Sequence, residues 1–146
     1  MLRRFTQRFT RGFTLLELMI VVVVIAILAS FAMYNYGRYA FRARRTDGRE
    51  MLMRVAAAQE RFFTNFNRYS GSLTDSAADG GLAFANTESD NKNYAITIAL
   101  GNGNATYTLT ATPQNAQAAD VCQNLTITDT GVKGQSGSPT ANGNCW

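Results

Sequence analysis

A predominantly apolar segment of 21 residues, from Phe13 to Met33, constrains this chain more than any other feature of its sequence. As an α-helix rising 1.5 Å per residue, it would be roughly 31 Å long, which matches the hydrocarbon core of a bilayer. The chain as a whole is 46% apolar, yet its mean hydropathy is only -0.13 because the rest is polar. The segment can therefore cross a membrane once.

A short basic segment precedes the apolar one. Arg3, Arg4, Arg8 and Arg11 lie within the first twelve residues, which contain no acidic residue and end at Gly12. The net charge of +4 belongs to this segment, because the other cations and the acids of the chain balance. A cleavable secretory signal has a shorter apolar region that lies before the cut. A cut after Gly12 would instead leave the apolar helix on the mature protein.

Glu17 places one carboxylate inside the apolar segment. An ionised side chain near the bilayer centre costs about 3 kcal/mol on insertion scales, so such a residue usually has a partner or a function. Cleavage after Gly12 would give Phe13 a new positively charged amine, one helical turn before Glu17. That amine could pair with Glu17 of the same chain or of a neighbouring chain. The alternative is that Glu17 reaches the lipid headgroups near the end of the helix.

The sequence RGFTLLEL, from Arg11 to Leu18, followed by MIVV, resembles the class III leader of type IV pilins and pseudopilins. The resemblance implies that a prepilin peptidase cleaves between Gly12 and Phe13, and that the amine of Phe13 is N-methylated. It also implies that subunits polymerise through their apolar helices, with Glu17 taking part in assembly. The chain would then comprise a leader (1–12), a transmembrane and assembly half of the helix (13–36) and a pilin head (37–146).

The same resemblance implies a location and a set of partners. The chain would cross the inner membrane once, in contact with lipid, with its head in the periplasm, and would later belong to an extracellular pilus. Its partners would be other pilin subunits, the prepilin peptidase and the inner-membrane assembly machinery. Charge counting does not decide the orientation, because five arginines between Arg38 and Arg49 follow the apolar segment closely.

The residues after the apolar segment predict that the helix continues to about Asn65. No proline occurs before Pro113, and apolar residues recur at near-helical spacing. Gly37 and Gly48 are the expected weak points, since each costs about 1 kcal/mol relative to alanine. The apolar stripe comprises Leu52, Val55, Ala56, Phe62, Phe63 and Phe66.

The rest of the chain predicts a small antiparallel sheet. Residues 67–91 read as a long loop with a short element around 82–84. Alternating apolar residues over 94–100 and 107–111 predict a β-hairpin, and the intervening Asn102-Gly103 suits a type I′ turn. A third strand is expected over 121–128, followed by a turn at 129–131 and a short fourth strand. The predicted fold class is α+β, a long N-terminal helix packed by its second half on this sheet.

Cys122 and Cys145 predict a disulfide in a head that lies outside the cytoplasm. Two unpaired thiols in a cytosolic protein are the alternative. Neither cysteine has a CxxC companion, and the chain contains no histidine. We therefore expect no metal, no cofactor and no catalytic residue, and the chain is not expected to be an enzyme.

A second resemblance extends over most of the chain. The segment QERFF at 59–63, the hairpin, Asp120 two residues before Cys122 and the terminal Cys145-Trp146 resemble the PilE-type minor pilins, a group that includes ComP-like DNA-uptake pilins. It implies a structural minor subunit that supports pilus assembly, twitching motility and adhesion. A DNA-uptake receptor pilin and a type II secretion pseudopilin are the alternatives.

Four arginines, Arg38, Arg42, Arg45 and Arg49, share one face of the predicted helix. They could form a stripe that binds phosphate. We favour the interpretation that they face lipid headgroups and pair with acidic heads of neighbouring subunits.

DNA binding by the head would depend on Lys92, Lys133 and exposed aromatic residues such as Tyr69 or Trp146. Two lysines are few, so such binding would be weak and sensitive to salt. DNA is therefore the less favoured partner.

Overall fold

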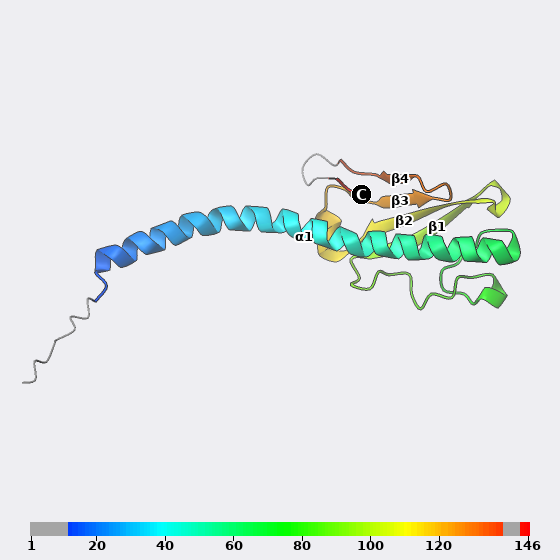
Figure 1. The fold of residues 1–146 in the computed structure, drawn as a ribbon, viewed down its shortest axis with the longest axis horizontal. Helices are drawn as coiled ribbons and strands as arrows, with labels where there is room; N and C mark the ends of the chain where they lie inside the picture. The colour runs from blue at the N-terminus through cyan, green and yellow to red at the C-terminus, as the bar shows by residue number, and fades with distance from the viewer. Residues whose placement is uncertain (1–11, 139–143) are drawn as a thin grey trace, which may run out of the picture. The chain divides into compact units, whose positions relative to one another are not determined.

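The computed structural model describes residues 12–138 and 144–146, without the side chains of 32–35. The chain forms two compact units, one that ends at Tyr36 and one that begins at Gly37. Figure 1 shows the elements, which are helix α1 (Leu15–Phe66), strands β1 (Tyr94–Gly101), β2 (Thr106–Pro113), β3 (Leu125–Thr128) and β4 (Lys133–Gln135), and the short 3-10 helices η1 (Ala77–Asp79), η2 (Asn102–Asn104) and η3 (Asn115–Ala119).

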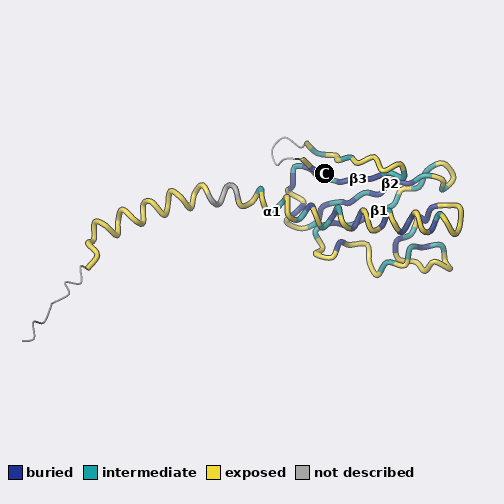
Figure 2. Tube along the Cα trace, viewed as in Figure 1, coloured by how far each residue is buried: buried dark blue, intermediate teal, exposed yellow. Residues whose placement is uncertain are grey.

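The first unit contains the apolar start of α1. Every residue from Phe13 to Phe31 is exposed, as the tube in Figure 2 shows. The helix begins at Leu15, two residues later than predicted. Thr14 precedes it, and the backbone N–H of Glu17 donates to Thr14 Oγ1 at 3.2 Å, which satisfies one of the free donors of the first turn. Within the described residues, α1 is the one helix long and apolar enough to cross a membrane.

The second unit packs the later part of α1 against a four-stranded antiparallel sheet of order β1-β2-β3-β4 (Figure 1). Leu52 and Val55 of α1 are fully buried against Ile96, Leu109 and Leu125 of the sheet. This arrangement confirms the predicted α+β fold class. The opposite face of the sheet carries threonines in register across strands, such as Thr97, Thr110 and Thr126. Alternation of apolar and polar residues is typical of a sheet with one buried face.

Gly48 is a packing position rather than a weak point of α1. A Cβ added there would lie 2.6 Å from the aromatic ring of Tyr94, so only glycine lets the helix approach β1 this closely. Of the predicted apolar stripe, Leu52, Val55 and Phe62 are buried. Ala56 and Phe63 are partly buried against the core, whereas Phe66, the last member of the stripe, is 46% exposed. The helix ends there because Asn67 has a φ of 52°, a left-handed conformation that asparagine tolerates.

The β1–β2 hairpin is confirmed, but its turn differs from the predicted one. Gly101 pairs with Thr106, so four residues connect the strands instead of the two of a type I′ turn. Asn102, Gly103 and Asn104 all have positive φ values, of 47°, 65° and 69°. A tertiary contact accompanies this longer turn, since the N–H of Tyr69 donates to the carbonyl of Asn104 at 2.9 Å.

Two other local expectations differ from the structure. The third strand covers only Leu125–Thr128, because Gln123 has a φ of 52° that interrupts regular pairing. Residues 121–124 still form backbone hydrogen bonds with 136–138. The short element in the long loop is η1 rather than 82–84. Residues 82–84 instead donate backbone hydrogen bonds to the carbonyls of 72, 73 and 75.

Candidate functional site

The first candidate site is the segment around the predicted cleavage point. Gly12, Phe13 and Thr14 lie before the helix, and with Glu17 they line an open hollow. Phe13 is 79% exposed. An exposed, non-helical peptide is the kind of backbone that a protease can bind. Glu17 lies in the first turn of α1, where the positive end of the helix dipole favours a carboxylate.

The first half of α1 presents a second feature, an apolar groove. Leu16, Met19, Ile20, Val23 and Val24 line it. Their side chains project at helical spacing and leave no polar face. A helix that is apolar all round requires lipid or other helices as its surroundings.

Two of the four arginines of the stripe, Arg45 and Arg49, have partners within the head itself, whereas Arg42 is exposed. Arg45 is fully buried and forms a bidentate ion pair with Asp120, with Nε–Oδ2 and Nη2–Oδ1 distances of 2.6 Å. Arg49 is half-buried and donates to the carbonyl of Cys145 from Nε at 3.1 Å and from Nη2 at 2.7 Å. The interpretation of the stripe as facing lipid headgroups is therefore wrong for both residues. The buried carboxylate of Asp120 requires a counter-charge, and Arg45 supplies it.

The phosphate-binding alternative fails at the same two residues. The guanidinium donors of Arg45 and Arg49 are engaged with this chain's own oxygen atoms. Burial, and then the positive charge of Arg45, lower the pKa of Arg49. The guanidinium of Arg49 nevertheless remains charged, since arginine does not lose its proton in proteins.

The ion pair belongs to a buried polar network that the sequence did not reveal. Gln117 of η3 donates from Nε2 to Asp120 Oδ2 at 2.9 Å and to the Tyr94 hydroxyl at 3.0 Å. Burial raises the pKa of Tyr94, so its hydroxyl stays protonated. Gln117 lies in a segment of Asn, Gln and Ala that resembles a solvated loop in composition. No local sequence signal distinguishes it from its neighbours.

The disulfide joins the same region to the C-terminus. Cys122 and Cys145 are bonded with an S–S distance of 2.00 Å and a Cα–Cα distance of 5.6 Å. The next residue, Trp146, donates from Nε1 to the carbonyl of Gly134 in β4 at 2.6 Å. Lys133 Nζ lies 5.2 Å from the centre of the Trp146 ring. One of the two candidate DNA-contacting lysines is thus engaged by a cation–π contact.

Tyr69, the other aromatic residue considered for DNA binding, is only 8% exposed, so its predicted exposure is wrong. It packs edge-on against Tyr107 with ring centroids 4.7 Å apart. The hydroxyls of both tyrosines donate to the carboxylate of Glu60, at 3.2 to 3.4 Å. Burial, reinforced by Glu60, raises the pKa of each tyrosine.

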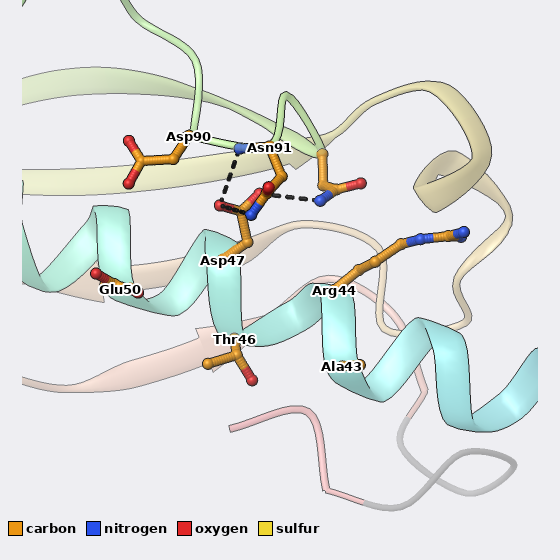
Figure 3. Close-up of a pocket in the computed structure, with 8 residues that line it drawn as sticks. Ala43, Arg44, Thr46, Asp47, Glu50, Asp90 and Asn91 are labelled. Atoms are coloured by element: carbon orange, nitrogen blue, oxygen red, sulfur yellow. Dashed lines mark hydrogen bonds between the residues drawn. The ribbon is translucent and has the colours of Figure 1, made fainter.

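An open hollow lies between α1 and the loop before β1 (Figure 3). In it the carboxylate of Asp47 accepts hydrogen bonds from Ser89 at 2.6 Å, from Asn93 at 3.0 Å and from Asn91 at 3.2 and 3.3 Å. Burial alone would raise the pKa of Asp47, but these hydrogen bonds together outweigh it and lower the pKa. Asp47 therefore fastens the loop to the helix. Glu50 and Asp90 also line the hollow, and their charge does not favour an anionic ligand.

Comparison with known proteins places the chain in a family. Residues 35–126 match the family model "Type IV minor pilin ComP, DNA uptake sequence receptor", and residues 7–33 match the prokaryotic N-terminal methylation motif. The type IV major pilin protein PilA of Myxococcus xanthus is 35% identical over 98 residues, which are 67% of this chain and 41% of PilA. The type IV major pilin protein PilE1 of Neisseria gonorrhoeae is 28% identical over 107 residues, which are 73% of this chain and 57% of PilE1.

The type IV major fimbrial protein FimA of Dichelobacter nodosus is 53% identical over 38 residues, which are 26% of this chain and 24% of FimA. This chain therefore spans less than two thirds of the length of each of these three relatives.

Solved structures that are similar to this one include two pilins. A type IV pilin from Shewanella oneidensis is 25% identical, with a TM-score of 0.51 over 73% of this chain and 97% of that one. The non-core minor pilin PilV of Neisseria meningitidis is 20% identical, with a TM-score of 0.52 over 73% of this chain and 96% of that one. This similarity shows the shared fold. Because the ComP family model matches well over half of the chain, this protein belongs to the type IV pilin family that the model describes.

Proposed function

We propose that this protein is a structural minor subunit of a type IV pilus, held in the inner membrane by α1 and then assembled through the same helix. The observation that carries the proposal is the exposed apolar first half of α1 in a chain of the pilin family. Lipid covers this surface before assembly, and helices of other pilin subunits cover it in the filament. The subunit supports pilus assembly, twitching motility and adhesion, and it catalyses no reaction.

The second part of the proposal concerns maturation. A prepilin peptidase removes the leader (1–12), and the new amine of Phe13 is methylated. The exposed, non-helical backbone of Gly12 and Phe13 and the match to the methylation motif support this step. The mature chain then comprises a transmembrane and assembly segment (13–36) and a head (37–146) that is first periplasmic and later extracellular.

Intact-mass analysis of the protein extracted from membranes tests maturation directly. The expected mass lacks the first twelve residues and includes one additional methyl group. A mature protein that retains its initiator methionine would contradict the proposal.

Assembly can be tested at Glu17, the proposed partner of the Phe13 amine in an adjoining subunit. Glu17→Ala should leave membrane insertion intact and reduce incorporation into sheared pili by about tenfold or more, since a charge left without its partner in an apolar environment is costly. Glu50→Ala, which removes an exposed carboxylate from the later part of α1, is the matched control. Equal incorporation of both variants would exclude Glu17 from assembly.

Deletion of the gene distinguishes the pilus from a secretion system. Loss of pili or twitching with unchanged protein export supports the pilus subunit, whereas impaired export with normal pili supports a type II secretion pseudopilin. Recruitment by the inner-membrane assembly machinery is part of the same proposal.

A DNA-uptake receptor is the second candidate function, and the description of the matching family model favours it. Two arginines of the stripe on α1 are not available for it. Lys92 and Lys133 are exposed, but Arg45 and Arg49 are engaged inside the head. Titration of the full chain in detergent with duplex DNA at rising salt tests this function. Binding at low salt that Lys92→Gln weakens would support it, and no binding at low salt would exclude it.

A further inference from the structure

Two arginines of α1 hold the backbone of the C-terminal cysteine. Arg45 Nη1 donates to the carbonyl of Asn144 at 3.2 Å. Arg49, one turn later, donates from Nε and Nη2 to the carbonyl of Cys145 at 3.1 and 2.7 Å. The α1 helix therefore binds the residue that carries one of the two sulfur atoms.

The segment of the other cysteine is bound by the same helix. Arg45 forms the bidentate pair with Asp120, two residues before Cys122, and the N–H of Cys122 donates to Asp120 Oδ1 at 3.4 Å. A single guanidinium thus contacts both cysteine-bearing segments, which lie 75 and 99 residues away from it along the chain. Cys122 and Cys145 are 0% and 2% exposed, so the bond lies in the core beneath these contacts.

We propose that Arg45 and Arg49 are positioning residues for the disulfide, which bring the two cysteines together before the bond forms. Bringing thiols 23 residues apart into contact costs chain entropy. Hydrogen bonds from fixed guanidiniums to the backbone compensate for part of that cost, because charge-assisted bonds are stronger and more directional than neutral ones. The disulfide then forms in a chain whose helix is already docked on the sheet.

The reaction itself is a thiol–disulfide exchange. The thiolate of one cysteine attacks a disulfide oxidant and forms a mixed disulfide, and the thiolate of the other cysteine displaces the remaining thiol. Cys122 and Cys145 together lose two electrons and two protons, and the oxidant becomes two thiols. The arginines take no part in this exchange, and they raise the effective concentration of one thiol near the other.

The thiol–disulfide equilibrium of the full chain in detergent, with glutathione as the redox partner, measures that effective concentration. Arg49→Gln should lower it about tenfold, since charged donors to the Cys145 carbonyl are lost. Arg49→Lys should recover part of the loss, because one charged donor returns. Arg54→Gln is the matched control, since Arg54 lies on the same helix and pairs with Asp90 at the surface, 2.9 Å away.

The proposal would be overturned if Arg49→Gln left the effective concentration of the thiols unchanged, or if Arg54→Gln lowered it equally. Helix content followed by circular dichroism under the same conditions separates positioning from unfolding. The thiol–disulfide equilibrium of these variants does not depend on pilus assembly. A failure of this proposal is therefore distinguishable from a failure of the proposed function.

Trp146, the only tryptophan of the chain, provides a second measurement. In a Cys122→Ser/Cys145→Ser chain, we expect its fluorescence to remain that of a docked indole, because Arg45 and Arg49 still hold the backbone. Adding Arg49→Gln should then shift the emission to longer wavelength. If the double serine variant alone already shows solvated tryptophan, the arginines do not position the tail and the proposal fails.

Discussion

At the scale of single residues, the buried pair of Arg45 and Asp120 links α1 to the segment before Cys122. Both side chains are fully excluded from solvent, and each would be costly alone. A pair of this kind adds little net stability compared with an apolar replacement, but it specifies which atoms must meet. It therefore fixes the docking of α1 on the segment that contains Cys122.

Removing one member of this pair should be costly. Asp120→Asn is expected to lower the free energy of unfolding by about 3 to 5 kcal/mol, because it leaves a buried guanidinium without its counter-charge. Replacing both residues, as in Arg45→Met/Asp120→Leu, should recover most of the loss. Denaturant titration measures the free energy of unfolding of each variant. Asp90→Asn, which breaks the exposed pair with Arg54, is the control and should cost less than about 1 kcal/mol. Similar losses in Asp120→Asn and Asp90→Asn would contradict this account.

Asp47 predicts a dependence of stability on pH. Its pKa is lowered in the folded chain from an ordinary value of 3.8. A carboxyl with a lowered folded pKa stabilises the fold above its unfolded pKa, and this contribution is lost as the pH falls through the folded pKa. The free energy of unfolding should therefore decrease below about pH 4, and the decrease should be smaller in Asp47→Asn. If the free energy of unfolding depended on pH in the same way in both proteins, the contacts of Asp47 with the loop would contribute nothing to stability.

At the scale of elements, the packing of α1 on β1 depends on a missing side chain. Gly37 and Gly48 look equivalent in the sequence, as two glycines inside one helix. They differ in the structure, because a Cβ at Gly37 meets no atom within 4 Å whereas one at Gly48 meets the ring of Tyr94. The ring lies there because Tyr94, the first residue of β1, packs on the helix at that turn.

The two glycines should respond in opposite ways to alanine. Gly37→Ala is expected to stabilise the helix by about 0.5 to 1 kcal/mol, since glycine is entropically unfavourable in a helix. Gly48→Ala should destabilise the head by about 1 to 3 kcal/mol, because overlap in a packed interior forces the backbone or the ring to move. Thermal unfolding of both variants and of the unchanged protein measures these differences in stability. A stabilised Gly48→Ala protein would contradict the close approach.

The helix also shapes the chain that follows it. Gln59, fully buried, donates from Nε2 to the carbonyl of Ser70 at 2.7 Å and accepts from the N–H of Ser70 at 2.9 Å. The side-chain amide of Gln59 thereby satisfies both the N–H and the carbonyl of Ser70, as the backbone of a neighbouring strand would. These two hydrogen bonds hold the chain at Ser70 against α1, shortly after the helix ends at Phe66.

At the scale of the whole molecule, the described contacts that stabilise the head lie in the unit from Gly37 to Trp146. The ion pair, the disulfide and the sheet core lie within it. The disulfide closes a loop of about 24 residues, which in the chain-entropy model contributes roughly 3 kcal/mol. The apolar residues of the other unit are all exposed from Phe13 to Phe31 and contribute none of this core.

Truncation tests how far toward the N-terminus the head extends. A fragment of residues 37–146 should fold, with tryptophan fluorescence of a docked Trp146. A fragment of residues 49–146 lacks Arg45 and should be less stable by at least about 3 to 5 kcal/mol, because Asp120 keeps a buried charge without a partner. Urea titration compares the two. Equal midpoints would place the boundary of the head after Arg45.

The sequence by itself determined the apolar helix, the hairpin and the fold class, because periods of 3.6 and 2 residues directly specify which face of an element is apolar. Only the tertiary structure decided the partners of Arg45 and Arg49, the need for glycine at position 48 and the four-residue turn of the hairpin. The reason is that each of these depends on atoms far apart along the chain. An arginine on a helix looks the same in the sequence whether it faces water or a buried aspartate 75 residues away.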